Sequence, residues 1–420
     1  MRKLLLLLIG AILYTGCTPA APPAAISFMI FGDVAEKVAY QQLVAAFKAK
    51  QPALNVELIH IPSQSDYRKR LGIDFAAGTP ADVVLINYRR YAAYAAQGAL
   101  EPLGPYLDRS SLLKAEDFYP ETLAPFRWQG TLACIPQNLS SLVVYYNKAL
   151  FDQAGLLYPA SGWSWDDFLA TAKALTRDLD GDGQSDQHGL GTEASLFRVA
   201  PFIWQNGGEL VDNPAAPTAL ALDTPAAQEA LQWFVNLQVK HHVVPSRVEE
   251  QSEASESRFL NGRLAMFLNS RRGVPTYRAI KGFDWDVAAL PQGRQAAGIL
   301  HADAYCMPAA SKQKQAAWSF IEFANSVEGQ TIIAGSGRTV PSLRAVAESP
   351  VFLDRSAKPY SSQVFLDTIP VIRGVPIMAS WADIEDTVGK EIERAYYGDV
   401  SVAEATAAAT KATQGFFAAR

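Results

Sequence analysis

The sequence predicts an α/β protein built from two domains. Its 420 residues, 49% of them hydrophobic, are more than one compact core of ordinary size holds. From Ile26 onward, apolar runs of strand length alternate with segments whose apolar residues recur at helical spacing. The opening order β-α-β-α-β-α implies a parallel sheet that helices cover on both faces.

The first three strands are expected at 26–31, 56–61 and 82–87. The run "ISFMIF" at 26–31 is almost continuously apolar, which is typical of a strand buried on both faces. In parallel sheets, ligands meet the loops that leave the carboxyl ends of the strands. Those loops are Phe31-Gly32-Asp33, Pro62-Ser63-Gln64 and Asn87-Tyr88-Arg89-Arg90. We therefore expect the ligand site to include these loops.

The middle and the tail of the chain add more strands and helices. Strands are expected at 131–136, 141–147, 263–269 and 285–291. A helix should begin near Trp165 with Ser164 as its cap, and "SVAE" at 401–404 forms a capping box for the last helix. Further helices are expected at 197–206, 226–240, 255–261, 313–325 and from about 381.

The N-terminus has the features of an export signal. Arg2 and Lys3 precede a short apolar run, and small residues lead to Cys17, so residues 1–16 are expected to be a signal peptide. The "LYTGC" stretch resembles a bacterial lipoprotein box, which implies a lipid on Cys17 and a tether over 17–25. An ordinary signal peptide with an incidental Cys17 is the alternative. We expect the mature protein at the outer face of the cytoplasmic membrane, in a periplasm or at the cell surface.

Charge and cysteine content narrow the range of partners. A formal net charge of −5 argues against a nucleic-acid partner. Cys134 and Cys306 lie in strand-like segments of an exported chain. They are expected either to form a disulfide bond or to remain as two buried thiols.

Several stretches, in order, resemble the extracytoplasmic sugar-binding proteins of ABC importers, the maltose-binding type. They are "FAAGTPADVVLINYRRYAAYAAQGALEPL", "LVVYYNKALFDQAGL", "FLNGRLAMFLNS", "AASKQKQAAWSFIEFANSVEGQ" and "GRTVPSLRAV". The resemblance implies a type II periplasmic-binding-protein-like fold of two lobes joined by a hinge, each a mostly parallel sheet flanked by helices. Lobe 1 is expected over 26–138 and 291–340, and lobe 2 over 139–290 and 341–420. The lobes would close over a ligand and dock on a membrane permease.

The resemblance also implies which residues contact the ligand. Asp33 aligns with a ligand-contacting carboxylate of the family, although it could equally cap the next helix. Phe197 and Trp381 stand where the family presents aromatic platforms, whereas Arg271 and Arg272 replace a ring found in many relatives. The full expected set is Phe31, Asp33, Gln64, Asn87, Arg89, Arg90, Ser140, Phe197, Arg271, Arg272, Asp303 and Trp381.

The predicted ligand is a neutral di- or oligosaccharide. Aromatic rings pack against the apolar face of a sugar, and planar polar groups bond its hydroxyls in pairs. Four arginines near one cleft make a phosphate- or carboxylate-bearing sugar or polyol the second candidate. A binder of another solute on the same frame, such as a polyamine, metal or oxyanion, is a further alternative.

The loop "DLDGDGQSDQHG" at 178–189 resembles a calcium-binding loop. Its expected ligands are Asp178, Asp180, Asp182, Gln184 and Asp186. The bidentate glutamate of the last position is missing, because Gly189 stands there. The loop lies far from the strand ends, so we expect either a structural Ca²⁺ site on a surface turn or a solvated turn without metal.

An enzyme is the rival class, and a glycosidase would need two opposed carboxylates, such as Asp33 and Asp303. The sequence contains no G-x-S-x-G, H-E-x-x-H or P-loop motif. We therefore expect a monomeric binding protein without catalytic activity and without a required cofactor.

Overall fold

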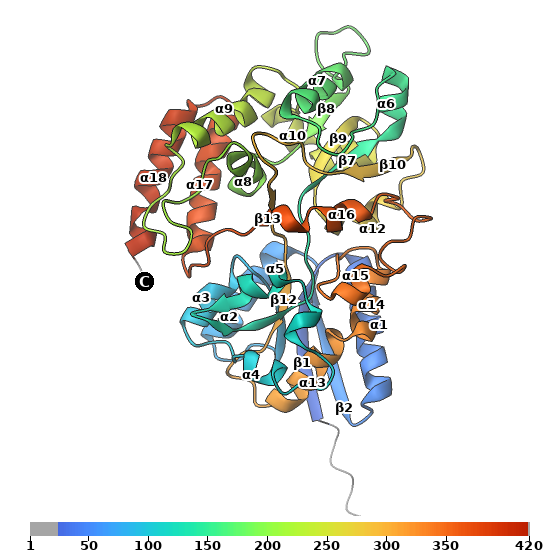
Figure 1. Cartoon of the computed structure of the whole chain (residues 1–420), viewed down its shortest axis with the longest axis vertical. Helices are drawn as coiled ribbons and strands as arrows, with labels where there is room; N and C mark the ends of the chain where they lie inside the picture. Colours follow the sequence, from blue (N-terminus) through green and yellow to red (C-terminus); the bar gives the residue numbers. More distant parts are fainter. Residues whose placement is uncertain (1–23, 419–420) are drawn as a thin grey trace, which may run out of the picture.

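The computed structural model describes residues 24–418 and folds into two α/β halves, one above the other in Figure 1. The expected signal peptide, Cys17 and nearly all of the tether lie outside the described residues. Within 24–418, no helix is both long enough and apolar enough to cross a membrane.

The first half contains a five-stranded sheet. Its order is β2 (Leu54–Ile61), β1 (Ala24–Phe31), β3 (Val83–Asn87), β12 (Asp303–Cys306) and β6 (Cys134–Pro136). β1 runs parallel to β2 and β3, which confirms the predicted β-α-β-α-β opening. β12 runs antiparallel to both β3 and β6.

Helices cover both faces of this sheet because β1 is apolar on both sides. Phe28 packs against Tyr40 of α1 (Val34–Lys50) and Phe320 of α13 (Lys314–Ala324). Phe31 points to the opposite face and packs against Tyr67 of α2 (Gln64–Ala76). The short α3 (Tyr91–Ala96) follows β3, and α14 (Val327–Gly335) packs against α1.

The second half contains a four-stranded sheet, whose order is β10 (Trp285–Ala288), β7 (Val143–Asn147), β9 (Leu264–Asn269) and β8 (His188–Gly191). Only β8 and β9 are parallel, while β7 is antiparallel to both of its neighbours. Both sheets are therefore mixed rather than mostly parallel. A strand buried on both faces gives the same continuous apolar run in either direction, so the sequence pattern does not reveal the direction.

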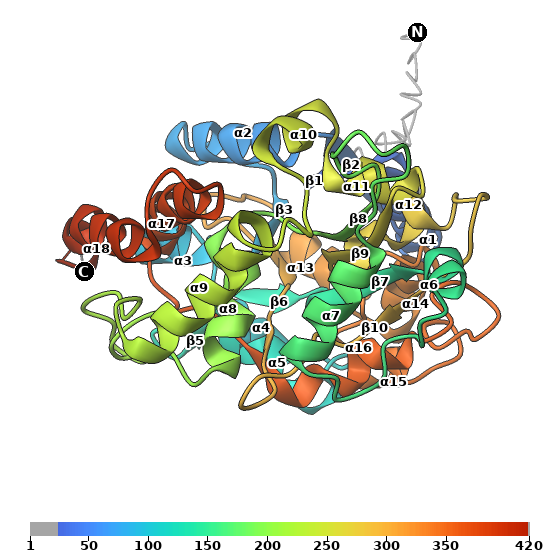
Figure 2. The same cartoon turned by 90° about the horizontal axis from the view of Figure 1, so that it is seen from above.

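Several long helices pack together at one end of the second half. α17 (Trp381–Tyr396) packs against α8 (Leu196–Gln205), α9 (Pro225–Val239) and α18 (Val402–Ala418). Figure 2 shows α17 and α18 at the end of the molecule opposite α6 (Lys148–Ala154) and α12 (Val274–Tyr277). The predicted caps are confirmed: Ser164 caps α7 (Trp165–Leu175), and Ser401 bonds Glu404 at the start of α18.

Shorter elements complete the described chain. They are α4 (Gly104–Leu107), η1 (Ala115–Asp117), α5 (Pro120–Leu123), η2 (Ala124–Phe126), β4 (Arg127–Trp128), β5 (Thr131–Leu132), α10 (Arg247–Ser252), α11 (Ser255–Leu260), η3 (Arg271–Gly273), β11 (Gly298–Ile299), α15 (Arg344–Ala347), α16 (Gln363–Asp367), η4 (Ile369–Val371) and β13 (Ile372–Arg373). The lobe boundary predicted at residue 340 remains a prediction, although α15 packs against α14 of the first half.

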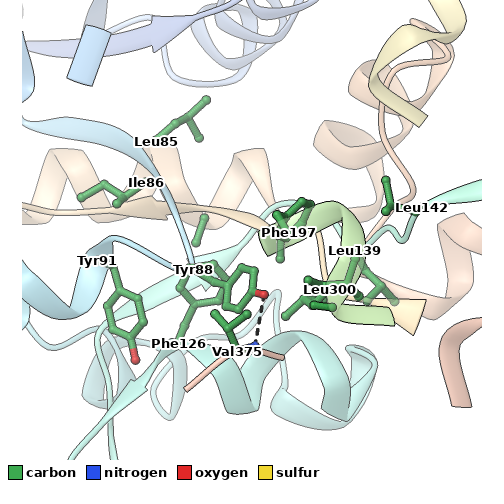
Figure 3. Packing of buried hydrophobic residues seen from close by; sticks show 14 of the residues in the cluster. Leu85, Ile86, Tyr88, Tyr91, Phe126, Leu139, Leu142, Phe197, Leu300 and Val375 are labelled. Atoms are coloured by element: carbon green, nitrogen blue, oxygen red, sulfur yellow. Dashed lines mark hydrogen bonds between the residues drawn. The ribbon is translucent and has the colours of Figure 1, made fainter. Parts of the chain in front are cut away.

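The segments that link the halves pack against one another. Ser140 and His301 exchange backbone hydrogen bonds of 2.8 Å, which joins the link after β6 to the link before β12. Leu139, Leu142 and Leu300 of these links are fully or almost fully buried, and Figure 3 shows them gathered near Phe197. In the same view the Val375 backbone N–H donates to the Tyr88 hydroxyl at 3.3 Å.

A disulfide bond joins Cys134 of β6 to Cys306 of β12. The register of the two strands pairs these residues directly, with their Cα atoms 4.5 Å apart. Of the two alternatives for these cysteines, the structure thus has the bridge.

Candidate functional site

A cavity of 330 Å³ lies between the two halves, where the strand ends of both sheets meet. Each of the three expected loops contributes at least one residue to it. The predicted residues that line it are Phe31, Gln64, Asn87, Arg89, Arg90, Ser140, Phe197, Arg272 and Asp303.

Strand register brings the first group of polar side chains together. Asn87 ends β3 and pairs with Asp303, the first residue of the antiparallel β12. The Asn87 amide donates to the Asp303 carboxylate at 3.1 Å, and its oxygen accepts from the Arg89 Nε at 3.1 Å. Asn87 therefore helps to fix the position of the Arg89 side chain, through the hydrogen bond that its side-chain oxygen accepts from the Arg89 Nε.

Arg89 joins the halves across the cavity. Its guanidinium forms an ion pair with Glu385 on α17 of the second half. The same guanidinium lies 4.0 Å from the centre of the Phe197 ring on α8, and the centre of the His301 ring lies 4.4 Å from it. Arg90 adds a second ion pair, to Asp386, at 3.5 Å.

Arg198 organises the second-half side of the cavity. Its Nε and Nη2 bond the two oxygens of Glu193 at 3.2 and 3.0 Å, and Arg198 holds the pKa of Glu193 below its usual value. Burial, then the charges of Arg198, Arg89 and Arg272, lower the pKa of His301 well below its usual value. His301 is therefore neutral near pH 7. Its Nε2 and the Arg198 Nη1 are buried without a hydrogen-bond partner among the described residues.

A buried carboxylate forms the floor near β1. Glu36 lines the cavity, and its Oε2 lies 2.6 Å from the Nη2 of Arg338. It fits beneath Gly32, whose φ of +128° suits glycine and whose missing Cβ leaves room for the Glu36 carboxylate. Burial, against the effect of Arg338, raises the pKa of Glu36 to about 7, and Asp303 and Asp33 add to the rise.

Asp33 does not line the cavity, which corrects one ligand-contact expectation. Its carboxylate caps α1 by accepting the Glu36 backbone N–H at 2.9 Å, and it contacts Arg338 at 3.2 Å. The alternative interpretation as a helix cap is thus confirmed. Asp33 can act on the cavity only through Arg338 and Glu36.

Trp381 and Arg271 were expected to contact ligand, and the structure places both in the interior. Trp381 is 0% exposed and packs in the core of the second half, so its ring offers no stacking surface in this structure. Arg271 is 2% exposed and donates to the Gly337 carbonyl and the Ser362 hydroxyl, each at 3.0 Å. Only its neighbour Arg272 reaches the cavity.

Sequence reasoning missed several lining residues, which lie on helices, in loops or at the end of β9. They are Glu36, Arg68, Asn138, Glu193, Ser195, Arg198, Asn269, Ser270, Arg338, Thr339, Val340, Glu385, Asp386 and His301. Two of them had a usable signal. Arg68 stands four residues after Gln64, on the same face of α2, and Arg198 follows Phe197 directly.

In the 178–189 loop, oxygens of Asp178, Asp180 and Asp186 lie within 4.8 Å of one another. Asp182 is not in this group, and its carboxylate accepts the Gln184 backbone N–H at 2.8 Å. The carboxylates also accept loop N–H groups, and the bonds from Gly183 and Gly181 lower the pKa of Asp178. All three grouped aspartates are exposed, and the residues fit an oxygen-ligated cation only in part.

Comparisons with known proteins agree with this arrangement. The bacterial extracellular solute-binding protein family matches residues 32–331. The chain is 24% identical to a mannitol-binding protein of Pseudomonas aeruginosa, over 90% of each chain. It is 23% identical to a putative binding protein of Brucella abortus, over 86% of this chain and 85% of the relative.

Solved structures share the fold. An ABC substrate-binding protein from Listeria monocytogenes, in complex with cycloalternan, superposes with a TM-score of 0.86 at 23% identity, covering 94% of this chain and 99% of the other. Maltose-bound MalE3 of T. maritima gives 0.79 at 24% identity, with 94% and 99% covered. The match over residues 32–331 shows that the chain belongs to the bacterial extracellular solute-binding protein family, whose members are receptors and not enzymes.

Proposed function

We propose that the protein captures a sugar or sugar alcohol by closing its two halves over it, and delivers it to the permease of an ABC importer. The observation that carries this proposal is the cavity between the halves, to which both contribute polar side chains. Hydroxyl-rich ligands suit such a lining of amides, carboxylates and guanidiniums. The mannitol-binding relative and the cycloalternan and maltose complexes support the same ligand class.

The size of the cavity favours a small ligand. Its 330 Å³ lies near the lower end of the range of roughly 300–1,000 Å³ for small-molecule sites. Within the di- or oligosaccharide range predicted from the sequence, this volume favours a disaccharide over a longer oligosaccharide. A monosaccharide or a polyol would also fit. A long oligosaccharide would need a wider or open-ended groove.

Export and anchoring complete the proposal. A lipid on Cys17 would hold the mature protein at the membrane, and the tether would let the folded body reach the permease. We also propose that the 178–189 loop binds a structural Ca²⁺, supported by the proximity of Asp178, Asp180 and Asp186.

Calorimetry combined with small-angle X-ray scattering tests the capture mechanism. A panel of hexoses, disaccharides and hexitols, together with their acidic derivatives, is titrated into the purified protein. We expect at least one compound to bind and to reduce the radius of gyration, because closure brings the halves together. If no compound produces heat of binding or a change in scattering, the proposed function is wrong.

A further inference from the structure

Among the described residues, the phenylalanines of the lining and Trp381 expose little ring surface to a neutral sugar. Of the two expected platforms, Trp381 is buried in the core, and the Phe197 ring is only 8% exposed and has both the Arg89 guanidinium and the His301 ring close to it. Phe31, the other phenylalanine of the lining, is 6% exposed and packs against Tyr67. The stacking contact on which the prediction of a neutral saccharide depended is therefore missing from the lining.

The lining contains more guanidinium groups than carboxylates. Four of its carboxylates already have an arginine partner: Glu36 with Arg338, Glu193 with Arg198, Glu385 with Arg89, and Asp386 with Arg90. The fifth, Asp303, bonds the Asn87 amide instead.

Arg68 and Arg272 remain without a carboxylate partner anywhere in residues 24–418. Asp303 offsets one of these two charges in part.

The two unpaired arginines stand among other cations. Burial and the charges of Arg90 and Arg89, against the smaller effect of Asp386 and Glu385, lower the pKa of Arg68 to about 10. Arg272 belongs to the second half of the protein, as Arg198 does, and the charges of both arginines contribute to the low pKa of His301. Buried donors are also unused on each side, namely the Arg90 Nε and the Arg198 Nη1. An unpaired donor in a closing cavity loses its water without gaining an acceptor, which is costly.

We propose that the ligand of this receptor carries an acidic group, a carboxylate or a phosphate, that binds the unpaired guanidinium of Arg68 or Arg272. The inference rests on the proposed function and reverses the order of ligand classes predicted from the sequence. A planar guanidinium binds either group through two parallel hydrogen bonds. A neutral hydroxyl also accepts a bond, but it leaves the excess positive charge in place when water departs.

The test uses matched compounds that differ only in charge. Glucose, glucuronate and glucose 6-phosphate form one set, and glycerol, glycerate and glycerol 3-phosphate form another. Each is titrated by calorimetry into the wild type, Arg68→Gln and Arg272→Gln. The matched control is Arg355→Gln, because Arg355 is exposed and lies outside the cavity lining. Circular dichroism and melting temperature establish that each variant folds. Because Arg272 is exposed, its replacement should not disturb the packing of the core.

We expect an acidic compound to bind at least about tenfold more tightly than its neutral parent, since a charged hydrogen bond contributes about 1.5–3 kcal/mol. Arg68→Gln or Arg272→Gln should remove most of that preference, whereas Arg355→Gln should keep it. The carboxylate and phosphate members show which acidic group is recognised. Inorganic phosphate, compared with chloride at equal ionic strength, should raise the melting temperature of the wild type but not of a double variant that combines Arg68→Gln and Arg272→Gln.

Two results would overturn the inference while the proposed function stands. One is a neutral compound that binds as tightly as its acidic counterparts. The other is acidic binding that neither arginine variant weakens. If neither the compounds of both panels nor inorganic phosphate affect the protein, both the inference and the proposed function fail.

Discussion

Replacing Glu36 with glutamine should change how the stability of the protein depends on pH. Glu36 lies beneath Gly32 at the edge of the ligand cavity, and its side chain is almost completely buried. Its neighbours are one cation, Arg338, and two carboxylates, Asp303 and Asp33. Glutamine keeps the shape of the protonated acid and removes the proton that titrates.

The size of the effect follows from the pKa. Burial raises the pKa of Glu36 from its ordinary 4.5 to about 7, so the native protein keeps a proton that the unfolded chain releases. Unfolding is therefore favoured as pH rises through this window, and wild-type stability should fall between about pH 4.5 and pH 7. A displacement of this size is worth about 3 kcal/mol above pH 7. Glu36→Gln should match the wild type near pH 5 and exceed its stability by that amount at pH 8.

Urea unfolding followed by tryptophan fluorescence measures the difference at pH 5, 6, 7 and 8. Glu57→Gln is the matched control, because Glu57 is an exposed glutamate on the neighbouring β2. Its pH profile should parallel that of the wild type. If Glu36→Gln and wild type differ by the same free energy at every pH, Glu36 does not retain a proton in the native state and the argument from burial is refuted.

Three further predictions concern the disulfide, the acidic loop and the core. Replacing Cys134 and Cys306 with alanine should lower the free energy of unfolding, by up to about 5 kcal/mol for a bridge that spans 172 residues; an unchanged urea midpoint would contradict this. Calcium at 100 times its dissociation constant should stabilise the protein by about 2.7 kcal/mol, and EDTA should reverse the rise in melting temperature without weakening ligand binding. A melting temperature that calcium and EDTA leave unchanged would exclude binding at the 178–189 loop. Trp381→Phe should cost roughly 1–3 kcal/mol of stability and leave ligand affinity intact, whereas a large loss of affinity would restore the stacking role.

Most of the fold follows from the apolar pattern of the sequence. Strands buried on both faces, such as Ala24–Phe31, produce runs that composition alone identifies, and capping residues such as Ser164 mark helix starts. Strand direction was not predictable in the same way. β12 returns antiparallel beside β3 after more than 200 intervening residues, and that pairing is set by tertiary packing rather than by local pattern.

The site was predictable where backbone geometry alone positions a residue. Asn87 lies at the carboxyl end of β3, where a parallel sheet presents its ligand loops, and Asp303 lies beside it because β12 runs antiparallel to β3. For Trp381 and Arg271 the ligand role was assigned by alignment to a motif, and such an alignment does not determine whether a side chain faces the cavity or the core. Burial of Arg271 is supported by the Gly337 carbonyl and the rings of Phe352 and Phe365, contacts that no local sequence signal announces.

Two ion pairs join the halves across the cavity, Arg89–Glu385 and Arg90–Asp386. The Arg90–Asp386 pair involves an exposed carboxylate, so water and salt screen it and its contribution is small. Arg89–Glu385 is better shielded, and Arg68 lies half-buried near Arg89 and Arg90 without an ion-pair partner of its own among the described residues. A ligand that binds only the closed arrangement shifts the equilibrium by its differential affinity for that state. If the ligand is acidic, as proposed above, its charge would offset the unpaired guanidinium charge of the lining in addition to making its own contacts, and it would favour the closed arrangement.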